Sequence, residues 1–235
     1  MDGMLRYGIE RMFARQVDDL VGSAEFRALE SGRAAPEQYD ALIENVVRAH
    51  LRSPQLLAFL YALAPPAAAD DLRHNLLEEL GLDGNHGARA HPELLKDLLA
   101  GAGLAHRLPA IEALADDDLR RVVVDPLLYG SLREAGLAAL TEIVAFEYML
   151  SRVSGRLARA LATHRALPAR ALAWFTHHAE VDVRHAEQGL ANLAAYAAYY
   201  DVEPLEALTI AELALREDVF ARRYFRDAEL AGARR

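Results

Sequence analysis

The stretch from Trp174 to Gln188 constrains this chain most, because it carries metal-ligand side chains at helical spacing. It reads WFTHHAEVDVRHAEQ, and His178, Asp182 and His185 follow one another in steps of four and three residues. In an α-helix with 3.6 residues per turn, these steps place the three side chains on one face over two turns. Imidazole and carboxylate groups together suit a divalent transition metal, above all iron where dioxygen is involved. The stretch therefore predicts a helix that supplies part of a metal site.

Apolar bulk on the same face distinguishes this helix from one that merely exposes polar residues to water. Trp174 and Phe175 precede the three ligand-type residues by one to two turns. Such a face predicts burial, and buried ionisable groups need partners. The neighbours that fall on other faces are expected to be solvated: His177, Glu180, Arg184 and Glu187. The alternative, three solvated or capped polar residues without a metal, stays open on spacing alone.

The composition predicts an all-α fold. Alanine and leucine dominate while β-branched residues are sparse, a balance that favours helices over strands. The 235 residues, 53% of them apolar, suffice for one large domain or two small ones. No segment alternates in the manner of a strand, and no repeat or low-complexity linker is visible. We therefore expect one all-α domain over residues 1–235, a bundle of about seven helices or slightly more.

Charge and cysteine content exclude several classes of function. The net charge of −9 leaves no basic stripe to neutralise phosphates, so a nucleic-acid partner is not expected. The chain has no cysteine, which excludes disulfides, thiolate metal sites, iron–sulfur clusters and cysteine nucleophiles. The first residues lack the pattern of a signal peptide, and two prolines interrupt the longest apolar run. A cytoplasmic protein without a membrane span is expected.

Glycine, proline and apolar periodicity divide the chain into helices. The expected helices cover about 4–30, 36–51, 55–63, 67–80, 91–101, 126–163, 168–200 and 203–230, with residues 81–90 as a glycine-rich loop. Residues 104–125 are expected to form short irregular helices, in which the acidic run 116–118 is a solvated cap. One inward stripe comprises Tyr39, Leu42, Ile43, Val46 and Val47, and Phe220, Tyr224 and Phe225 are expected in the core.

The helix predicted over 126–163 offers a carboxylate on its apolar face. Glu147 interrupts a stripe that otherwise reads Leu137, Leu140, Val144, Leu150 and Ser154. An unpaired buried carboxylate is costly, so Glu147 is expected to meet a cation or another polar group. Glu142 lies on a different face and is the second choice. A glutamate at the edge of the helix, without any functional role, is the simpler alternative.

A third set of ligand candidates flanks the glycine-rich loop. The segment HNLLEELG, residues 74–81, ends one helix with Glu79, and His91 begins the next. A ten-residue loop can bring these two side chains together, although Glu78 and His86 could take their places. Helix ends are rich in Glu and His for capping reasons, so this signal is weak by itself.

The three sets together can hold two metal ions. They comprise Glu79, His91, Glu147, His178, Asp182 and His185, three carboxylates and three imidazoles from four helical segments. Such a set can bind two Fe ions, loaded as Fe(II), and leave open positions for dioxygen. Hard carboxylates stabilise the oxidised metal pair, and neutral imidazoles keep the reduced pair bound.

The segments NLLEELG…HPELL, AALTEIVAFEYM and WFTHHAEVDVRH resemble those of the haem-oxygenase-like diiron oxidases and oxygenases. That family shares its seven-helix fold with the thiaminase-II and pyrroloquinoline-quinone-synthase groups, and the resemblance spans residues 40–190. It implies that the family's His-x3-Asp-x2-His motif falls on His178, Asp182 and His185. It further places the family's middle-helix glutamate on Glu147 and its early Glu and His on Glu79 and His91.

Departures from related groups narrow the expected chemistry. No Glu-x-x-His occurs, which sets aside the ferritin type of diiron bundle. Thiaminase-II-like members act through a cysteine, which this chain lacks. Members that make p-aminobenzoate use a lysine after the middle glutamate, where this chain has only Arg152, Arg156 and Arg159. Some N-oxygenating members recruit an additional carboxylate from an earlier helix; Glu44 is the candidate here, with a surface position as the alternative.

The resemblance implies a non-haem diiron oxygenase or oxidase of specialised, natural-product metabolism. Its expected substrate is an amino acid, an amine or a fatty acid, and its outcome N-oxygenation, desaturation or oxidative C–C cleavage. Expected partners are a small-molecule substrate and dioxygen, with an external electron donor and a homodimer as options. The alternatives are a metal-free oxidase like the pyrroloquinoline-quinone-synthase group and a non-enzymatic helical small-molecule-binding protein.

Overall fold

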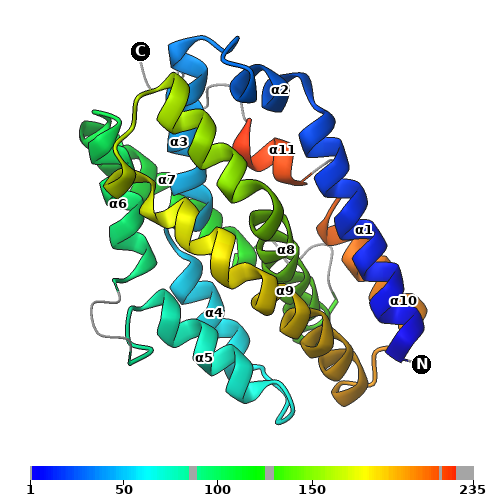
Figure 1. Ribbon diagram of the computed structural model, residues 1–235. Helices are drawn as coiled ribbons and strands as arrows, with labels where there is room; N and C mark the ends of the chain where they lie inside the picture. Colours follow the sequence, from blue (N-terminus) through cyan, green and yellow to red (C-terminus); the bar gives the residue numbers. More distant parts are fainter. Residues whose placement is uncertain (1, 85–88, 125–129, 217–218, 226–235) are drawn as a thin grey trace.

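A computed structural model describes residues 2–84, 89–124, 130–216 and 219–225, without the side chains of residues 2, 122–124 and 181–183. Over these residues the regular elements are helices, and no strand occurs among them (Figure 1). The all-α bundle expected from the composition is thereby confirmed. Within the same ranges, no helix is both long and apolar enough to traverse a bilayer.

Two long helices form the centre of the bundle. Helices α8 (Leu132–His164) and α9 (Ala173–Tyr199) run antiparallel and pack against each other more extensively than any other pair (Figure 1). A short connection that contains the 3-10 helix η3 (Ala169–Leu172) joins them. Buried residues of α8 such as Leu137 and Val144 face Leu190 and Leu193 of α9 in the common core.

Helix α1 (Asp2–Gly22) covers α9 and α10 (Pro204–Ala214) on one side of this pair (Figure 1). The expected single helix over 4–30 is wrong, because Ser23 interrupts it. The Ser23 hydroxyl accepts a hydrogen bond of 3.1 Å from the backbone N–H of Phe26 and starts helix α2 (Ala24–Glu30). Serine favours such an N-cap because its side chain satisfies an N–H that has no partner inside the helix.

The opposite side of the bundle comprises α3 (Pro36–His50), α4 (Ser53–Ala62) and α5 (Ala69–Glu79). Proline opens α3 and lies near the start of α4, where its missing N–H costs nothing. The inward stripe expected on α3, from Tyr39 to Val47, is buried throughout. Helix α3 packs against α6 (His91–Gly101), α7 (Leu108–Val124) and α11 (Val219–Tyr224).

The turn at Gly81 brings α5 and α6 (His91–Gly101) together at the metal-ligand candidates. Gly81 has a positive φ of 67°, and a Cβ there would lie 2.7 Å from the backbone nitrogen of Ala90. Only glycine accepts both this conformation and this approach without strain. Residues 85–88 of the loop lie outside the described part, whereas its two ends close on each other as the sequence predicted.

The region 104–125 forms one regular helix rather than several irregular ones. After the 3-10 turn η1 (Ala105–Arg107), helix α7 (Leu108–Val124) continues for 17 residues. Its apolar positions Ile111 and Ala115 are fully buried against the core, and this packing outweighs the acidic run that suggested a break. Asp118, within that run, is not a solvated cap, because it is bound by Arg48 of α3.

Two further boundaries differ from expectation. Helix α8 begins at Leu132, and the expected start at Asp125-Pro126 lies outside the described residues. The expected helix over 203–230 ends at Ala214, and a separate short helix, α11 (Val219–Tyr224), follows. Residues 226–235 lie outside the description. Phe220 and Tyr224 are buried and Phe225 packs against the core, as expected for these aromatics.

A glycine-to-alanine pair tests the close packing of α8 on α9. A Cβ at Gly189 of α9 would lie 2.7 Å from both γ-carbons of Val144, whereas a Cβ at Gly155 of α8 meets nothing nearer than 3.6 Å. We expect Gly189→Ala to destabilise the protein by about 1–3 kcal/mol through overpacking. Gly155→Ala should stabilise it by about 0.5–1 kcal/mol. Urea unfolding of both variants is the measurement, and equal stability of the two would refute this packing.

Candidate metal centre

Three buried ligand-type residues from three helices converge at the end of the Gly81 loop. One ligand atom each of Glu79, His91 and His178 lies within 4.8 Å of the other two. The shortest contact is 2.8 Å, between Oε1 of Glu79 and Nδ1 of His91. Among the described residues, these three form the cluster whose ligand atoms lie close enough together to hold a metal ion. The pairing of Glu79 with His91, left open by the sequence, is thus the one that the fold brings together.

The hydrogen bond of His178 orients its ring for metal binding. Nδ1 of His178 lies 2.8 Å from the backbone oxygen of Trp174. A carbonyl oxygen can only accept, so Nδ1 carries the proton and Nε2 keeps its lone pair for the cluster. Metal-binding histidines commonly donate their second N–H to a carbonyl in this way. The ring of Trp174 lies against the same imidazole, with centroids 4.2 Å apart, and restrains it further.

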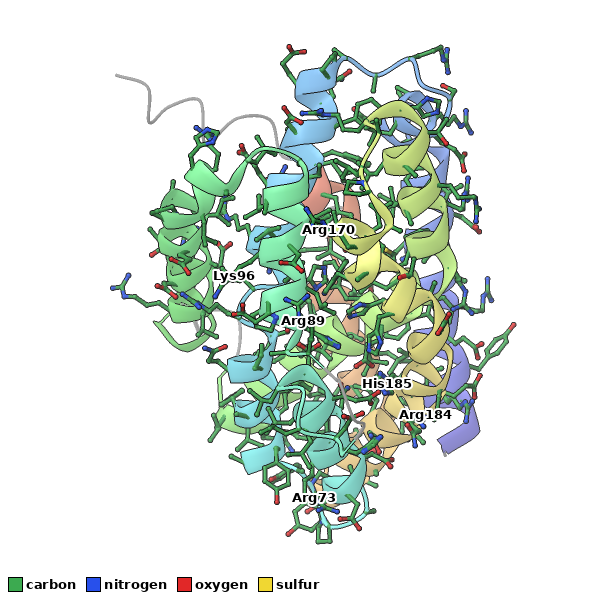
Figure 2. All side chains as sticks on the ribbon, turned by 60° about the vertical axis from the view of Figure 1, so that its left-hand side comes forward. Arg73, Arg89, Lys96, Arg170, Arg184 and His185 are labelled. Carbon is green, nitrogen blue, oxygen red and sulfur yellow. The ribbon has the colours of Figure 1, made fainter. Side chains whose placement is uncertain are left out.

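A second pair of ligand-type side chains lies two turns further along α9. Nε2 of His185 is 2.9 Å from Oε2 of Glu78, and both side chains are buried. Glu78 was the alternative to Glu79 in the sequence, and the structure uses both: Glu79 faces His91, while Glu78 faces His185. Arg184 is exposed and lies beside His185 on α9 (Figure 2). Its Nη2 is 3.6 Å from Oε2 of Glu78.

Glu147 of α8 lines the same cavity as Glu79, His91, His178 and His185. Its pKa is raised, first by burial, and also by the charges of Glu79 and Glu78, while His185 acts in the opposite direction. Nδ2 of Asn75 donates a hydrogen bond of 2.5 Å to its Oε1. Asn75 thus fixes the orientation of the carboxylate, a role that the sequence did not mark.

Burial and pairing shift the pKa values of Glu78, Glu79 and His178 toward the protonation states that bind metal. Burial raises the pKa of Glu79, but the charge and hydrogen bond of His91 and the hydroxyl of Ser53 outweigh it, so the net shift is downward. The Ser53 hydroxyl donates to Oε2 of Glu79 over 2.6 Å. Burial holds the pKa of His178 well below its usual value, and the hydrogen bond from His185 lowers that of Glu78. Anionic carboxylates beside neutral imidazoles are the forms that bind metal.

The other site candidates fall in different places. Asp182 belongs to α9, but its side chain lies outside the described part, as does the whole of His86. Glu142 faces away from the cluster and accepts a hydrogen bond of 2.6 Å from Arg223. Glu44 is buried rather than on the surface. Its two carboxylate oxygens accept hydrogen bonds from Nε and Nη2 of Arg107, at 2.9 and 3.3 Å.

His177 does not belong to the solvated side of α9, where the sequence placed it. It is half-buried, and its ring lies 4.9 Å from that of His91, centroid to centroid. The cause is the position of α6, which covers this flank of α9 and whose first residue is His91. Glu180, Arg184 and Glu187 are exposed as expected.

A cavity of about 290 Å³ opens beside the cluster. Glu79, His91, Glu147, His178 and His185 line one end of it. His50 of α3 also lines the cavity, and Nε2 of His50 is 2.7 Å from the Tyr224 hydroxyl. Burial lowers the pKa of His50 to about 3, so this imidazole is neutral near pH 7 and accepts from the tyrosine.

The donor chemistry is compatible with iron. The side chains offer oxygen and nitrogen atoms as ligands, and no sulfur. The buried carboxylates of Glu78, Glu79 and Glu147 repel one another, so a bound cation would compensate their charges. Mixed imidazole and carboxylate ligands beside a cavity are typical of non-haem iron sites that react with dioxygen. The residues present therefore fit bound iron, and the open cavity gives a substrate access to it.

The comparison with protein families agrees with this chemistry. A family model described as iron-containing redox enzyme, with the haem-oxygenase-like fold, matches residues 40–218. The chain therefore belongs to this family of iron-containing redox enzymes, and it is an oxidoreductase by class. The matched range includes each of the six ligand candidates, from Glu79 to His185. A search of curated proteins found none that matches the chain.

Proposed function

We propose that the protein is a non-haem diiron oxygenase or oxidase that uses dioxygen to oxidise a small molecule. The observation that carries this proposal is the doubled donor set. Glu79, His91 and His178 form one group, Glu78 and His185 form a second, and Glu147 lines the same cavity. A single metal ion needs only one such group, whereas two ions sharing a carboxylate would use both.

The residues divide into ligands and supports. Glu79, His91 and His178 would hold one iron, and His185 with Asp182 would hold the other, with Glu147 shared. Glu78 is a further carboxylate for the second position, since it already binds His185. Ser53, Asn75 and the carbonyl of Trp174 orient three of these ligands through hydrogen bonds. Such supports preserve ligand geometry when a metal is exchanged or oxidised.

Iron(II) bound at this site would supply the electrons that activate dioxygen. The chain's own residues bind the substrate in the adjoining cavity and keep bulk water from the site through Trp174, Phe146 and Leu57. The Tyr224 hydroxyl donates to neutral His50 and fixes the orientation of this imidazole at the cavity wall. An amino acid, an amine or a fatty acid is the proposed substrate, and an external electron donor would return electrons between turnovers.

Oxygen uptake tests this function directly. Iron-loaded protein should consume dioxygen when amino acids or fatty acids are screened, and zinc-loaded protein, which is redox-inactive, should not. Uptake that is equal in iron-loaded, zinc-loaded and metal-free protein would instead support a metal-free oxidase. Absence of uptake together with tight binding of a small molecule would support a helical carrier.

A further inference from the structure

The cavity lining is rich in arginine. It includes Arg48 of α3, Arg121 of α7, Arg222 and Arg223 of α11, and Arg52 and Arg216, which lie between helices. Arg48 and Arg223 both approach Asp118, and Arg223 binds Glu142, so these two arginines mark an end of the cavity distinct from the metal-ligand candidates. The carboxylates on this part of the wall are Asp118 and Glu142. The proposed chemistry at the metal centre uses none of these groups.

Arg223 is the cation best placed to meet a ligand. Its Nη2 donates to Oε1 of Glu142 over 2.6 Å, whereas its Nη1 is 3.9 Å from Asp118, beyond hydrogen-bond distance. Asp118 itself is engaged by Arg48, through Nε at 2.6 Å and Nη2 at 2.9 Å. A guanidinium has five N–H donors in a planar fork that matches a carboxylate. Arg223 is 26% exposed, and within the described part of the chain Glu142 occupies one of its donors.

Apolar side chains also line the cavity, among them Leu57, Leu119, Ala138, Ala139, Ile143 and Phe146. Glu142 at one end and Glu147 at the other lie five residues apart on α8, a rise of about 7.5 Å along the helix. His50 lies between the ends, since its ring is 4.8 Å from that of Trp174, which stacks on His178, and its Nε2 is 2.7 Å from the hydroxyl of Tyr224, the neighbour of Arg223. A ligand held at Arg223 therefore reaches the metal centre with its opposite end.

We propose that this cavity binds a small carboxylic acid with its carboxylate on Arg223 and with its apolar end at the metal centre. The inference rests on the proposed function for the oxidation step and specifies its substrate class and orientation. The atom oxidised is then remote from the carboxylate, and the product retains that carboxylate. An amine without a carboxylate would leave Arg223 without its ligand.

The size of the cavity limits the acid. About 290 Å³ is at the small end of the range for ligand pockets, roughly 300–1,000 Å³. A short straight-chain acid or an amino acid of similar length matches this volume and the apolar middle of the wall. The simple acid and the amino acid carry the same carboxylate. The α-ammonium group of an amino acid can in addition donate hydrogen bonds to the neighbouring Asp118 and Glu142.

Calorimetric titration of the iron-loaded protein, kept anaerobic, tests the proposal with hexanoate, norleucine and hexylamine. These probes share a six-carbon chain and differ in the charged groups at one end. We expect at least one of the two acids to bind and hexylamine not to bind. Preference for norleucine would assign the site to amino acids, and preference for hexanoate would assign it to simple acids. Hexylamine binding as tightly as both acids would overturn the proposal.

Variants of Arg223 connect the binding to this residue. Arg223→Gln should weaken the binding of the acid by about tenfold to a hundredfold, the range for a lost hydrogen bond to a charged group. The control is Arg156→Gln, because Arg156 binds Glu30 at 2.7 and 2.8 Å outside the cavity. Since Arg223→Gln leaves Glu142 without its cation, the double variant Glu142→Gln, Arg223→Gln is measured as well. Undiminished acid binding in this folded double variant would contradict the proposal.

The experiment can reject the proposed diiron function and the proposed carboxylate site independently of each other. Iron content is measured on the same samples by metal analysis. Acid binding that depends on Arg223 in a protein without iron would uphold the carboxylate site and reject the diiron function. Two irons per chain with acid binding that ignores Arg223 would do the reverse.

Discussion

Replacing His178 or His185 by alanine should abolish dioxygen-dependent activity and at least halve the iron bound per chain, while the helical content stays unchanged. Each imidazole is buried, and each belongs to a different donor group, with Glu79 and His91 or with Glu78. Loss of one ligand therefore opens one iron position and leaves the carboxylates at that position without compensation. Iron analysis, circular dichroism and oxygen uptake on the same preparations measure the three effects.

An exposed histidine provides the control for these two variants. His106 lies in the 3-10 turn η1, away from the cavity lining, and is solvated. His106→Ala should keep the parent's iron content and activity. Iron bound as tightly by His178→Ala and His185→Ala as by the parent would show that α9 does not contribute ligands, whatever the activity of these variants.

Exchanging Glu147 for glutamine should lower iron binding strongly and at the same time stabilise the metal-free protein near neutral pH. Glutamine keeps an oxygen for the Asn75 amide but loses the charge. Because burial raises the folded-state pKa of Glu147 above its unfolded value, the charged carboxylate costs stability at any pH above that folded pKa. Removing the charge relieves this cost and also removes the proposed bridging ligand. Thermal unfolding with and without iron(II) separates the two effects.

Glu142→Gln is the matched control on the same helix. Glu142 binds Arg223 rather than the metal-ligand candidates, so this variant should retain its iron. Its metal-free form should not gain stability, because Arg223 loses its partner. The opposite pattern, with iron lost in Glu142→Gln and kept in Glu147→Gln, would mean that the other face of α8 carries the ligand.

Helical periodicity is a local property, so the sequence predicted which face of α9 is buried. The steps between His178 and His185 place both side chains on that face. Glu147 was proposed as a ligand because a single carboxylate interrupts an apolar stripe. The pairing of Glu79 with His91 needed the structure, since it depends on how closely the ends of the loop approach at Gly81.

Contacts between distant segments could not be predicted in the same way. Asp118 in an acidic run resembles a solvated residue, and only the packing of α7 on α3 places it against Arg48. His177 differs from its expected environment because α6, remote in sequence, covers that flank of α9. The arginine-rich end of the cavity likewise combines α3, α7 and α11, and no local pattern marks it.

The number of iron ions bound per chain tests the diiron assignment most directly. The metal-free protein would be loaded anaerobically with iron(II), freed of excess metal, and analysed for iron against protein concentration determined by amino-acid analysis. The doubled donor set around Glu147 predicts close to two irons per chain in the parent. It also predicts a value near one or below in His178→Ala and in His185→Ala. A parent value near zero would contradict the diiron assignment, and a value that stays at one under saturating iron(II) would reduce the site to a single metal.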